Sequence, residues 1–212
     1  RFLSTSHFTF IDTNFNTLKW YRQLNATYTD DYGSLPLYNM GDPRNVLVAK
    51  RNNQLDDYFS FGPFTGYFTQ ENDIPFYQTR SPYTEANYIS ALGRGQAFSI
   101  LHTQNINERW NFLVRYRRLN SLGAYSNSQN IQSRFLFNTH YQSPEGKYEV
   151  FAYAISEKLD ADESGGLASD TVFENNEAIP TEAIPLIFSG GTAEKRIVRN
   201  REFFAQQRLN FL

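Results

Sequence analysis

Three arginines, Arg115, Arg117 and Arg134, are the residues whose types and spacing most readily suggest a chemical role. Arg115 and Arg117 stand two residues apart, and alternate side chains of a β-strand share one face, so these two belong together. Arg134 occupies the same kind of position on the next expected strand, with Asn138 and His140. Guanidinium groups that line a pore raise the local concentration of anions, so this polar face predicts contact with anionic solutes.

Two other interpretations of these arginines remain open. They could be paired with acidic residues across the same surface, or they could lie on an exposed face of an ordinary sheet. Arg118 would point the opposite way from Arg117 and would need its long side chain to reach an aqueous interface.

Other candidate chemistry in the sequence is weak. His7, His102 and His140 are too dispersed to suggest a metal cluster. Residues 160–165, Asp-x-Asp-x-Ser-Gly, resemble the start of a calcium loop, but Thr171 stands where the bidentate glutamate belongs, so a solvated loop is favoured. No nucleophile elbow, phosphate-binding loop or zinc-protease motif is present, and the chain has no cysteine. We therefore expect no catalytic residue, no cofactor, no metal ligand and no enzyme.

The elements that must position the arginines show a period of two. In residues 109–120 the apolar side chains Trp110, Phe112, Val114 and Tyr116 fall on one face, and Asn111 falls with the arginines on the other. Soluble sandwiches also alternate, with the apolar face turned inward. A transmembrane β-strand alternates because it places apolar groups against lipid and polar groups against a lumen.

The same alternation recurs around residues 17–28, 131–143 and 201–212. On the membrane interpretation, the predicted lipid-facing residues are Trp20, Trp110, Phe112, Val114, Tyr116, Phe135, Phe137 and Tyr141. The predicted pore-lining residues are Lys19, Gln23, Asn111, Arg115, Arg117, Arg134, Asn138, His140, Gln206 and Arg208.

Composition narrows the class of protein. The formal net charge of −2 argues against nucleic acid as a partner, because such binding relies on neutralising phosphates. Aromatic residues make up 17% of the 212 residues, with 19 Phe and 14 Tyr, which suits aromatic girdles at two membrane interfaces. No apolar run approaches the roughly 20 residues of a membrane helix.

The expected elements are strands, and we expect about ten of them. Several approach the roughly 9–11 residues that cross a bilayer at a tilt. The expected strands are Phe8–Asp12, Thr17–Tyr28, Asn45–Lys50, Phe59–Gln70, Tyr83–Leu92, Gln96–Asn105, Arg109–Leu119, Ile131–Gln142, Lys147–Lys158 and Arg201–Leu212.

The connections between these strands also sort by length. Residues 105–109 and 143–146 are short turns at one end of the sheet, whereas 120–130 and 159–200 are long connections at the other. Short turns at one end and long polar loops at the other match the periplasmic and extracellular ends of an outer-membrane barrel. The connection 71–82 is an exception, because it is long and falls at the short-turn end.

Several segments, in this order, resemble one known family. They are Asp12–Phe15, Asn39–Asp42, Asp73–Glu85, Gly93–Gln96, His102–Asn107, Leu119–Tyr125 and Glu163–Leu167. They resemble the putative porin family of Bacteroidetes outer membranes and span most of the chain.

The resemblance implies an all-β fold, an antiparallel transmembrane β-barrel in the cell outer membrane, with passive diffusion of small solutes as its function. Members of the family are much longer, so we expect residues 1–212 to form the N-terminal part of a larger barrel, with 159–200 as a long extracellular loop. Implied partners are membrane lipid, lipopolysaccharide and small solutes, with envelope-complex proteins or a homo-oligomer left open. A plugged scaffold barrel and a soluble periplasmic β-sandwich or ligand-binding barrel are the alternatives.

Overall fold

The fold was obtained as a computed structural model that places most of the second half of the chain. The residues it describes are 34–36, 39–46, 62–69, 71, 74–91, 95–123, 125–174, 179–180, 183–188 and 194–210.

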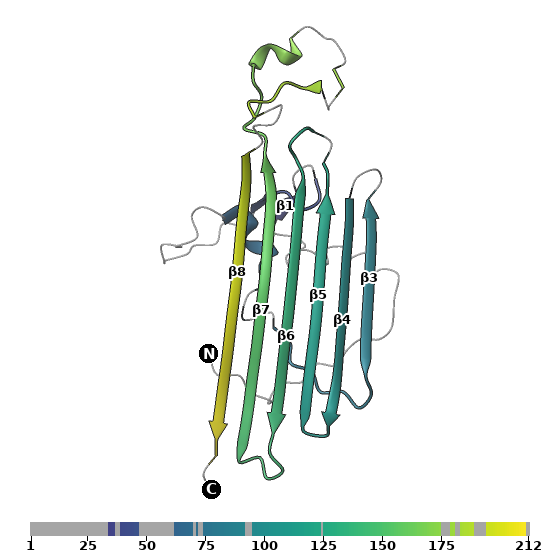
Figure 1. Cartoon of the computed structure of the whole chain (residues 1–212), viewed down its shortest axis with the longest axis vertical. Coiled ribbons are helices and arrows are strands. Elements are labelled where there is room, and N and C mark those ends of the chain that lie inside the picture. The colour runs from purple at the N-terminus through teal and green to yellow at the C-terminus, as the bar shows by residue number, and fades with distance from the viewer. Residues whose placement is uncertain are drawn as a thin grey trace.

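One antiparallel sheet dominates the described residues, and its six strands follow one another in chain order (Figure 1). Each strand pairs with the next, so the ladder is built entirely from neighbours in sequence. The strands are β3 (Tyr83–Ala91), β4 (Gly95–Asn107), β5 (Trp110–Ser121), β6 (Asn130–Gln142), β7 (Tyr148–Glu163) and β8 (Glu194–Leu209).

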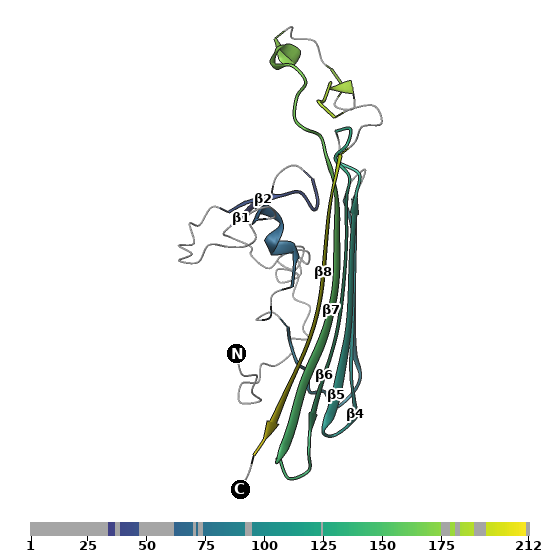
Figure 2. The ribbon, with the colours of Figure 1, turned by 60° about the vertical axis from the view of Figure 1, so that its left-hand side comes forward.

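Shorter elements lie against one side of this sheet. The small hairpin of β1 (Ser34–Pro36) and β2 (Arg44–Val46) and the 3-10 helix η1 (Gly62–Tyr67) sit on the same side, toward which the sheet curves (Figure 2). A second 3-10 helix, η3 (Asp170–Phe173), belongs to the connection between β7 and β8. Among the described residues, no helix has the length and apolarity needed to cross a membrane.

The all-β antiparallel expectation is confirmed, but the expectation of about ten strands is wrong for the described residues. Their main sheet has six strands and is open. The expected strand at 59–70 is wrong because Pro63 has no N–H to donate to a ladder and suits a helix start, so the 3-10 helix η1 forms there. The strand expected at 45–50 is described only as far as Val46 in β2. The strands expected at 8–12 and 17–28 lie outside the described residues.

The two ends of the sheet differ as the connection lengths predicted. Glu108 and Arg109 form a two-residue turn, and 143–147 another short turn, at one end. At the other end β7 runs on to Glu163 and β8 begins at Glu194, so the strands extend into the range expected as loop. In the connection expected at 71–82, residues 74–79 run along the sheet before β3 begins.

The core lies on the side of the sheet that carries η1, which we call the inner face. Leu101, Leu113, Leu136 and Ile155 come from four neighbouring strands and pack with Ile74 of the N-terminal part. Leu113 has no exposed surface. Fully burying a side chain of this size stabilises a fold by about 1.5–3 kcal/mol, so this layer holds the N-terminal segments to the sheet.

We predict that Leu113→Ala lowers the free energy of unfolding by about 2–5 kcal/mol, because it removes buried methyl groups and leaves a cavity in this layer. Leu122→Ala is the control, since Leu122 is 51% exposed and its loss should cost less than about 0.5 kcal/mol. Urea titration followed by the intrinsic fluorescence of the folded protein measures both. Equal losses for the two variants would contradict the placement of the core.

Candidate pore-lining surface

The inner face collects all of the predicted pore-lining residues that the structure describes. The strand register places Arg117 opposite Arg134 and Asn111 opposite His140, while Asn138 is fully buried on the same face of β6. Gln206 and Arg208 of β8 oppose Phe151 and Glu149, which are also buried on this face. Lys19 and Gln23 lie outside the described residues.

Residues 39–42 cover the inner face near the long-loop end. Asn39 donates its side-chain amide to the Ser128 carbonyl oxygen at 3.0 Å, and the Ser121 hydroxyl donates to the Asn39 side-chain oxygen. Asn130 donates to the Asp42 carboxylate at 2.6 Å. Burial raises the pKa of Asp42, although hydrogen bonds from the Asn39 backbone and from Asn130 oppose the rise. These contacts place a carboxylate over the sheet.

Gly41 lies close against the sheet. Its φ of +90° is a backbone conformation that side chains with a Cβ rarely adopt. A Cβ built there would lie 2.8 Å from Leu119 Cδ2 and 3.1 Å from Asn130 Cβ. The Gly41 carbonyl also accepts a hydrogen bond of 3.3 Å from Gln132. Glycine is therefore required both for the turn and for the contact.

A second contact joins η1 to the middle of the inner face. Arg134 donates to the Tyr67 carbonyl oxygen at 2.7 Å. Glu157, directly opposite Arg134 on β7, accepts from both the backbone N and the hydroxyl of Thr69, at 2.9 and 2.6 Å. Asn200 donates to the other Glu157 oxygen at 3.2 Å. Arg134 and Glu157 are therefore bound to residues 67–69 and are not open to bulk water.

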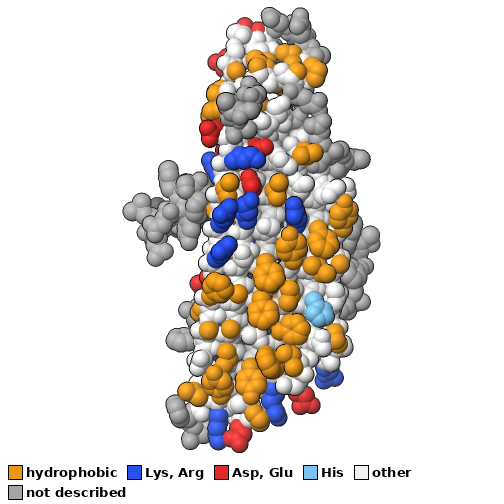
Figure 3. All heavy atoms as spheres, viewed as in Figure 1, with side chains coloured by type: hydrophobic (Ala, Val, Ile, Leu, Met, Phe, Trp, Pro, Cys, Tyr) orange, Lys and Arg blue, Asp and Glu red, His pale blue; other side chains and the backbone are white. Residues whose placement is uncertain are grey.

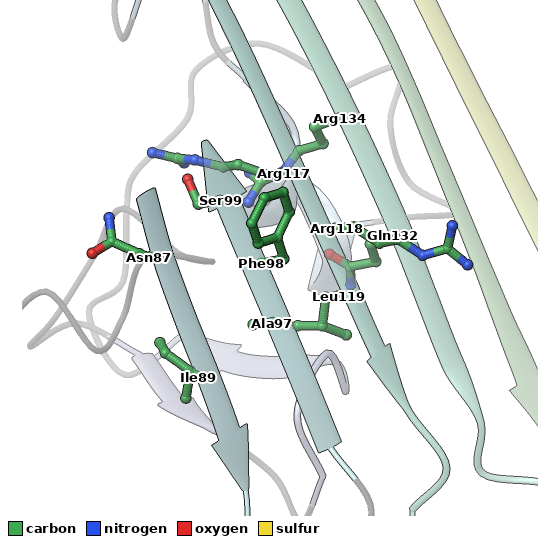
Figure 4. A pocket seen from close by; sticks show the side chains of 10 residues that line it. All are labelled: Asn87, Ile89, Ala97, Phe98, Ser99, Arg117, Arg118, Leu119, Gln132 and Arg134. Atoms are coloured by element: carbon green, nitrogen blue, oxygen red, sulfur yellow. The ribbon is translucent and has the colours of Figure 1, made fainter. Parts of the chain in front are cut away.

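Arg117 is less completely bonded than Arg134. It extends past Ser99, and Arg134 points toward it from β6 (Figure 4). Its Nε atom is buried and has no hydrogen-bond partner. Arg115 faces the same way one position of the alternation further along β5. Three guanidinium groups thus converge on one inner-face region.

The short-turn end of the inner face carries an amide side chain and a buried carboxylate with two partners. Asn138 donates to the Pro75 carbonyl oxygen at 2.7 Å, so residues 74–79 are tied to the sheet here as well. Glu149 is 3% exposed and lies 3.1 Å from His140 Nε2 and 3.1 Å from Arg208 Nη1. His140 also stacks on Phe151, with ring centroids 4.4 Å apart. The carboxylate therefore has a partner on either side.

The sequence prediction missed the acidic residues of this surface, among them Glu149 and Glu157. Glu149 and Glu157 stand at alternate positions of β7 with Phe151, Tyr153 and Ile155, and all five share the inner face. The same period-two rule that selected the arginines would have found them. Their positions support the interpretation of the arginines as partly balanced by acids.

A cavity of about 610 Å³ lies where the inner face meets the long-loop end. Its walls come from Asp42 and Phe64, from the connection between β5 and β6, and from the connection that follows β7. Glu163 and Arg196 line it and form an ion pair of 3.0 Å, and Arg196 also lies 5.5 Å from the centre of the Phe64 ring. A carboxylate and a guanidinium group therefore both line this cavity.

The opposite side of the sheet, which we call the outer face, is apolar over most of its height. Apolar side chains form a continuous region with Lys and Arg gathered above and below it (Figure 3). Trp110, Phe135 and Phe137 are 41%, 40% and 37% exposed, and Phe203 is 80% exposed. Seven predicted lipid-facing residues lie on this face, namely Trp110, Phe112, Val114, Tyr116, Phe135, Phe137 and Tyr141. Trp20 lies outside the described residues.

Aromatic side chains with polar ends gather at the short-turn edge of this apolar region. Trp110 and Tyr141 are cross-strand partners whose rings meet edge to face at 6.4 Å, and Tyr148 follows at 6.4 Å from Tyr141. The Trp110 indole donates to the Thr139 hydroxyl at 2.8 Å. Such rings suit a boundary that is apolar on one side and wet on the other.

We predict that Gly41→Val loosens residues 39–46 from the inner face. The added side chain meets Leu119, and overpacking of about 1–3 kcal/mol corresponds to roughly 5–150-fold faster amide hydrogen exchange in this segment. Gly166→Val is the matched control, because Gly166 has the same φ of +90° but nothing within 4 Å. Hydrogen exchange with mass spectrometry measures both, and unchanged protection of residues 39–46 in Gly41→Val would refute the contact.

Comparison with known proteins identifies the family. The sequence profile of the family described as "Putative porin" matches residues 2–211, which is nearly the whole chain. No functionally curated protein and no solved structure matches the chain. The match agrees with an all-β antiparallel sheet whose two faces differ in polarity, and the chain belongs to the putative porin family.

Proposed function

We propose that this chain forms part of the wall of an outer-membrane β-barrel that admits small solutes by passive diffusion. The observation that carries the proposal is the sheet's division into an exposed apolar outer face and an inner face that carries the arginines, amides and carboxylates around a buried apolar layer. A bilayer requires apolar side chains on the lipid side, and a lumen requires polar ones on the other. The residues of the outer face are thus the lipid-facing set, and those of the inner face line the lumen.

The dimensions of the outer face fit a membrane. On β5 the apolar positions run from Trp110 to Tyr116, which is about 20 Å of antiparallel strand. Charged residues of the hairpins, such as Glu108 and Lys147, bound the region at one end, and Arg118 bounds it at the other. Outer-membrane barrels carry an apolar band of about 25 Å. Strands of 12–16 residues from β4 to β8 are long enough to cross it.

The open edges of the sheet indicate a larger barrel. Among the described residues, neither β3 nor β8 has a strand on its outer edge. Unpaired backbone N–H and C=O groups cost several kcal/mol each in hydrocarbon, so a membrane barrel must close. We propose that β3 and β8 pair with further strands of the complete wall, with the connection between β7 and β8 on the extracellular side.

Inner-face arginines support a mild preference for anions. Arg115 and Arg117 form no ion pair within the described part of the chain, whereas Arg134 lies opposite Glu157. Fixed positive charge along a solute path favours anions. The presence of Glu149 and Glu157 on the same face keeps the proposed preference small.

A specific observation also favours a second function, a plugged barrel that serves as a scaffold. Residues 39–42, η1 and 74–79 bind to the inner face through Asn130, Arg134 and Asn138. This cover occupies part of the surface that a solute would follow. In this second function the barrel holds envelope-complex proteins or further copies of itself and conducts nothing.

Current recordings of the full-length protein in planar bilayers distinguish the two functions. Discrete conductance steps support the porin, whereas a silent protein that copurifies with stoichiometric partners supports the scaffold. A protein that leaves the envelope without detergent would be soluble, and both membrane functions would fail.

For the open porin we predict that Arg115→Gln combined with Arg117→Gln shifts the reversal potential in a salt gradient toward cation preference. The two substitutions remove positive charge from the inner face without introducing a negative one. Arg115→Lys with Arg117→Lys is the control, because it keeps both charges and should keep the anion preference. A wild-type pore that prefers cations, or a shift of the same size in the lysine variant, contradicts the assignment.

We predict that Gly41→Val raises single-channel conductance if residues 39–46 restrict the lumen, because the substitution weakens their contact with Leu119 and Asn130. Gly166→Val should leave conductance at the wild-type value. Identical conductance in all three proteins would show that the segment lies outside the solute path.

A further inference from the structure

A row of basic side chains crosses the outer face beside the apolar region, at its long-loop edge. Arg118 of β5, Ser133 of β6, Lys158 of β7 and Arg199 of β8 are successive cross-strand partners, so they form one line over four strands. Arg201, two residues along β8, faces the same way. We call Arg118, Lys158, Arg199 and Arg201 the basic row. Figure 3 shows Lys and Arg side chains gathered in this band.

The basic row is poorly neutralised by the protein itself. Lys158 lies 3.0 Å from Asp160, but Arg118, Arg199 and Arg201 take part in no ion pair within the described part of the chain. Lys158 and Arg199 are directly opposite each other, and like charges in that arrangement destabilise a sheet. All three arginines are exposed, so no packing role explains their positions. The arrangement is therefore suited to an external anion.

On β5 and β6 the neighbouring row of the outer face is apolar, while on β8 the same row holds Arg201. Tyr116 and Phe135 are cross-strand partners one alternation toward the short-turn end from Arg118 and Ser133. The next positions, Val114 and Phe137, continue the apolar surface. A ligand that fits both features carries anionic oxygens at one end and long apolar chains at the other. A phosphorylated membrane lipid has this division.

We propose that the basic row binds the phosphate groups of an outer-leaflet lipid whose acyl chains lie along the apolar outer face. This inference rests on the proposed function, because it requires the outer face to be embedded in a bilayer. Guanidinium groups hold phosphate oxygens in pairs through parallel N–H donors. A free phosphate ion would make only exposed contacts that salt screens, whereas the lipid adds burial of its chains against Tyr116 and Phe135.

The test uses the full-length protein in phosphatidylcholine nanodiscs that contain a small fraction of diphosphorylated lipid A. Native mass spectrometry measures the retained lipid. The variant Arg118→Gln/Arg199→Gln/Arg201→Gln removes three charges from the basic row. The matched control, Arg80→Gln/Arg109→Gln/Lys147→Gln, removes three exposed charges at the short-turn end. Each basic residue near an anionic surface contributes about fivefold, so we expect about a hundredfold weaker retention in the first variant alone.

Retention by wild type and control, with loss in the row variant, supports the proposal. The proposal is overturned if both variants retain the lipid equally, or if the wild-type protein retains dephosphorylated lipid A as well as the diphosphorylated form. Displacement of the lipid by inorganic phosphate also overturns it. Conductance of the same wild-type protein distinguishes failure of the lipid site from failure of the proposed function. A conducting protein without lipid preference overturns the lipid site alone, whereas a protein that does not insert overturns the proposed function too.

Discussion

The rest of the structure depends on one constraint, namely that a β-strand sends alternate side chains to opposite sides of its sheet. Because six consecutive strands pair in order and keep the same phase, each row of side chains continues from one strand to its neighbour across the sheet. One face becomes an exposed aromatic surface, and the other collects the amides, guanidinium groups and carboxylates around a buried apolar layer. A shift of one residue in any strand would exchange the two faces, so the register and the chemistry of both surfaces are inseparable.

The inner face is only partly a polar surface, and its apolar layer explains why the N-terminal part is bound to it. Leu101, Leu113, Leu136 and Ile155 would be costly to expose to a water-filled lumen, and Ile74 covers them. The flanking polar groups then find partners on the same segments, since Arg134 and Asn138 donate to backbone oxygens of Tyr67 and Pro75. The restriction of the lumen and the stability of the sheet therefore come from the same contacts.

Much of this arrangement could be predicted from the sequence, since period two alone places Arg115, Arg117 and Arg134 on one face and Trp110, Phe135 and Phe137 on the other. The six strands from Tyr83 onward follow from the same pattern. The cover on the inner face could not be predicted, because it joins residues about 90 apart in the chain, such as Gly41 and Gln132. The 3-10 helix at 62–67 was mistaken for a strand because its aromatic residues suit either element, and the meaning of Pro63 was overlooked. The acidic partners Glu149 and Glu157 were predictable and were missed.

The most direct test of the two-faced wall is a spin-label scan of β5, which lies in a stretch of 212 residues without cysteine. A single cysteine is introduced and labelled at each position from Trp110 to Arg117 in the full-length protein in lipid bilayers, and collision with dissolved oxygen is measured. Oxygen concentrates in the acyl region, so the account predicts high collision rates at positions 110, 112, 114 and 116 and low rates at positions 111, 113, 115 and 117. The opposite phase, or rates that do not alternate, would contradict it.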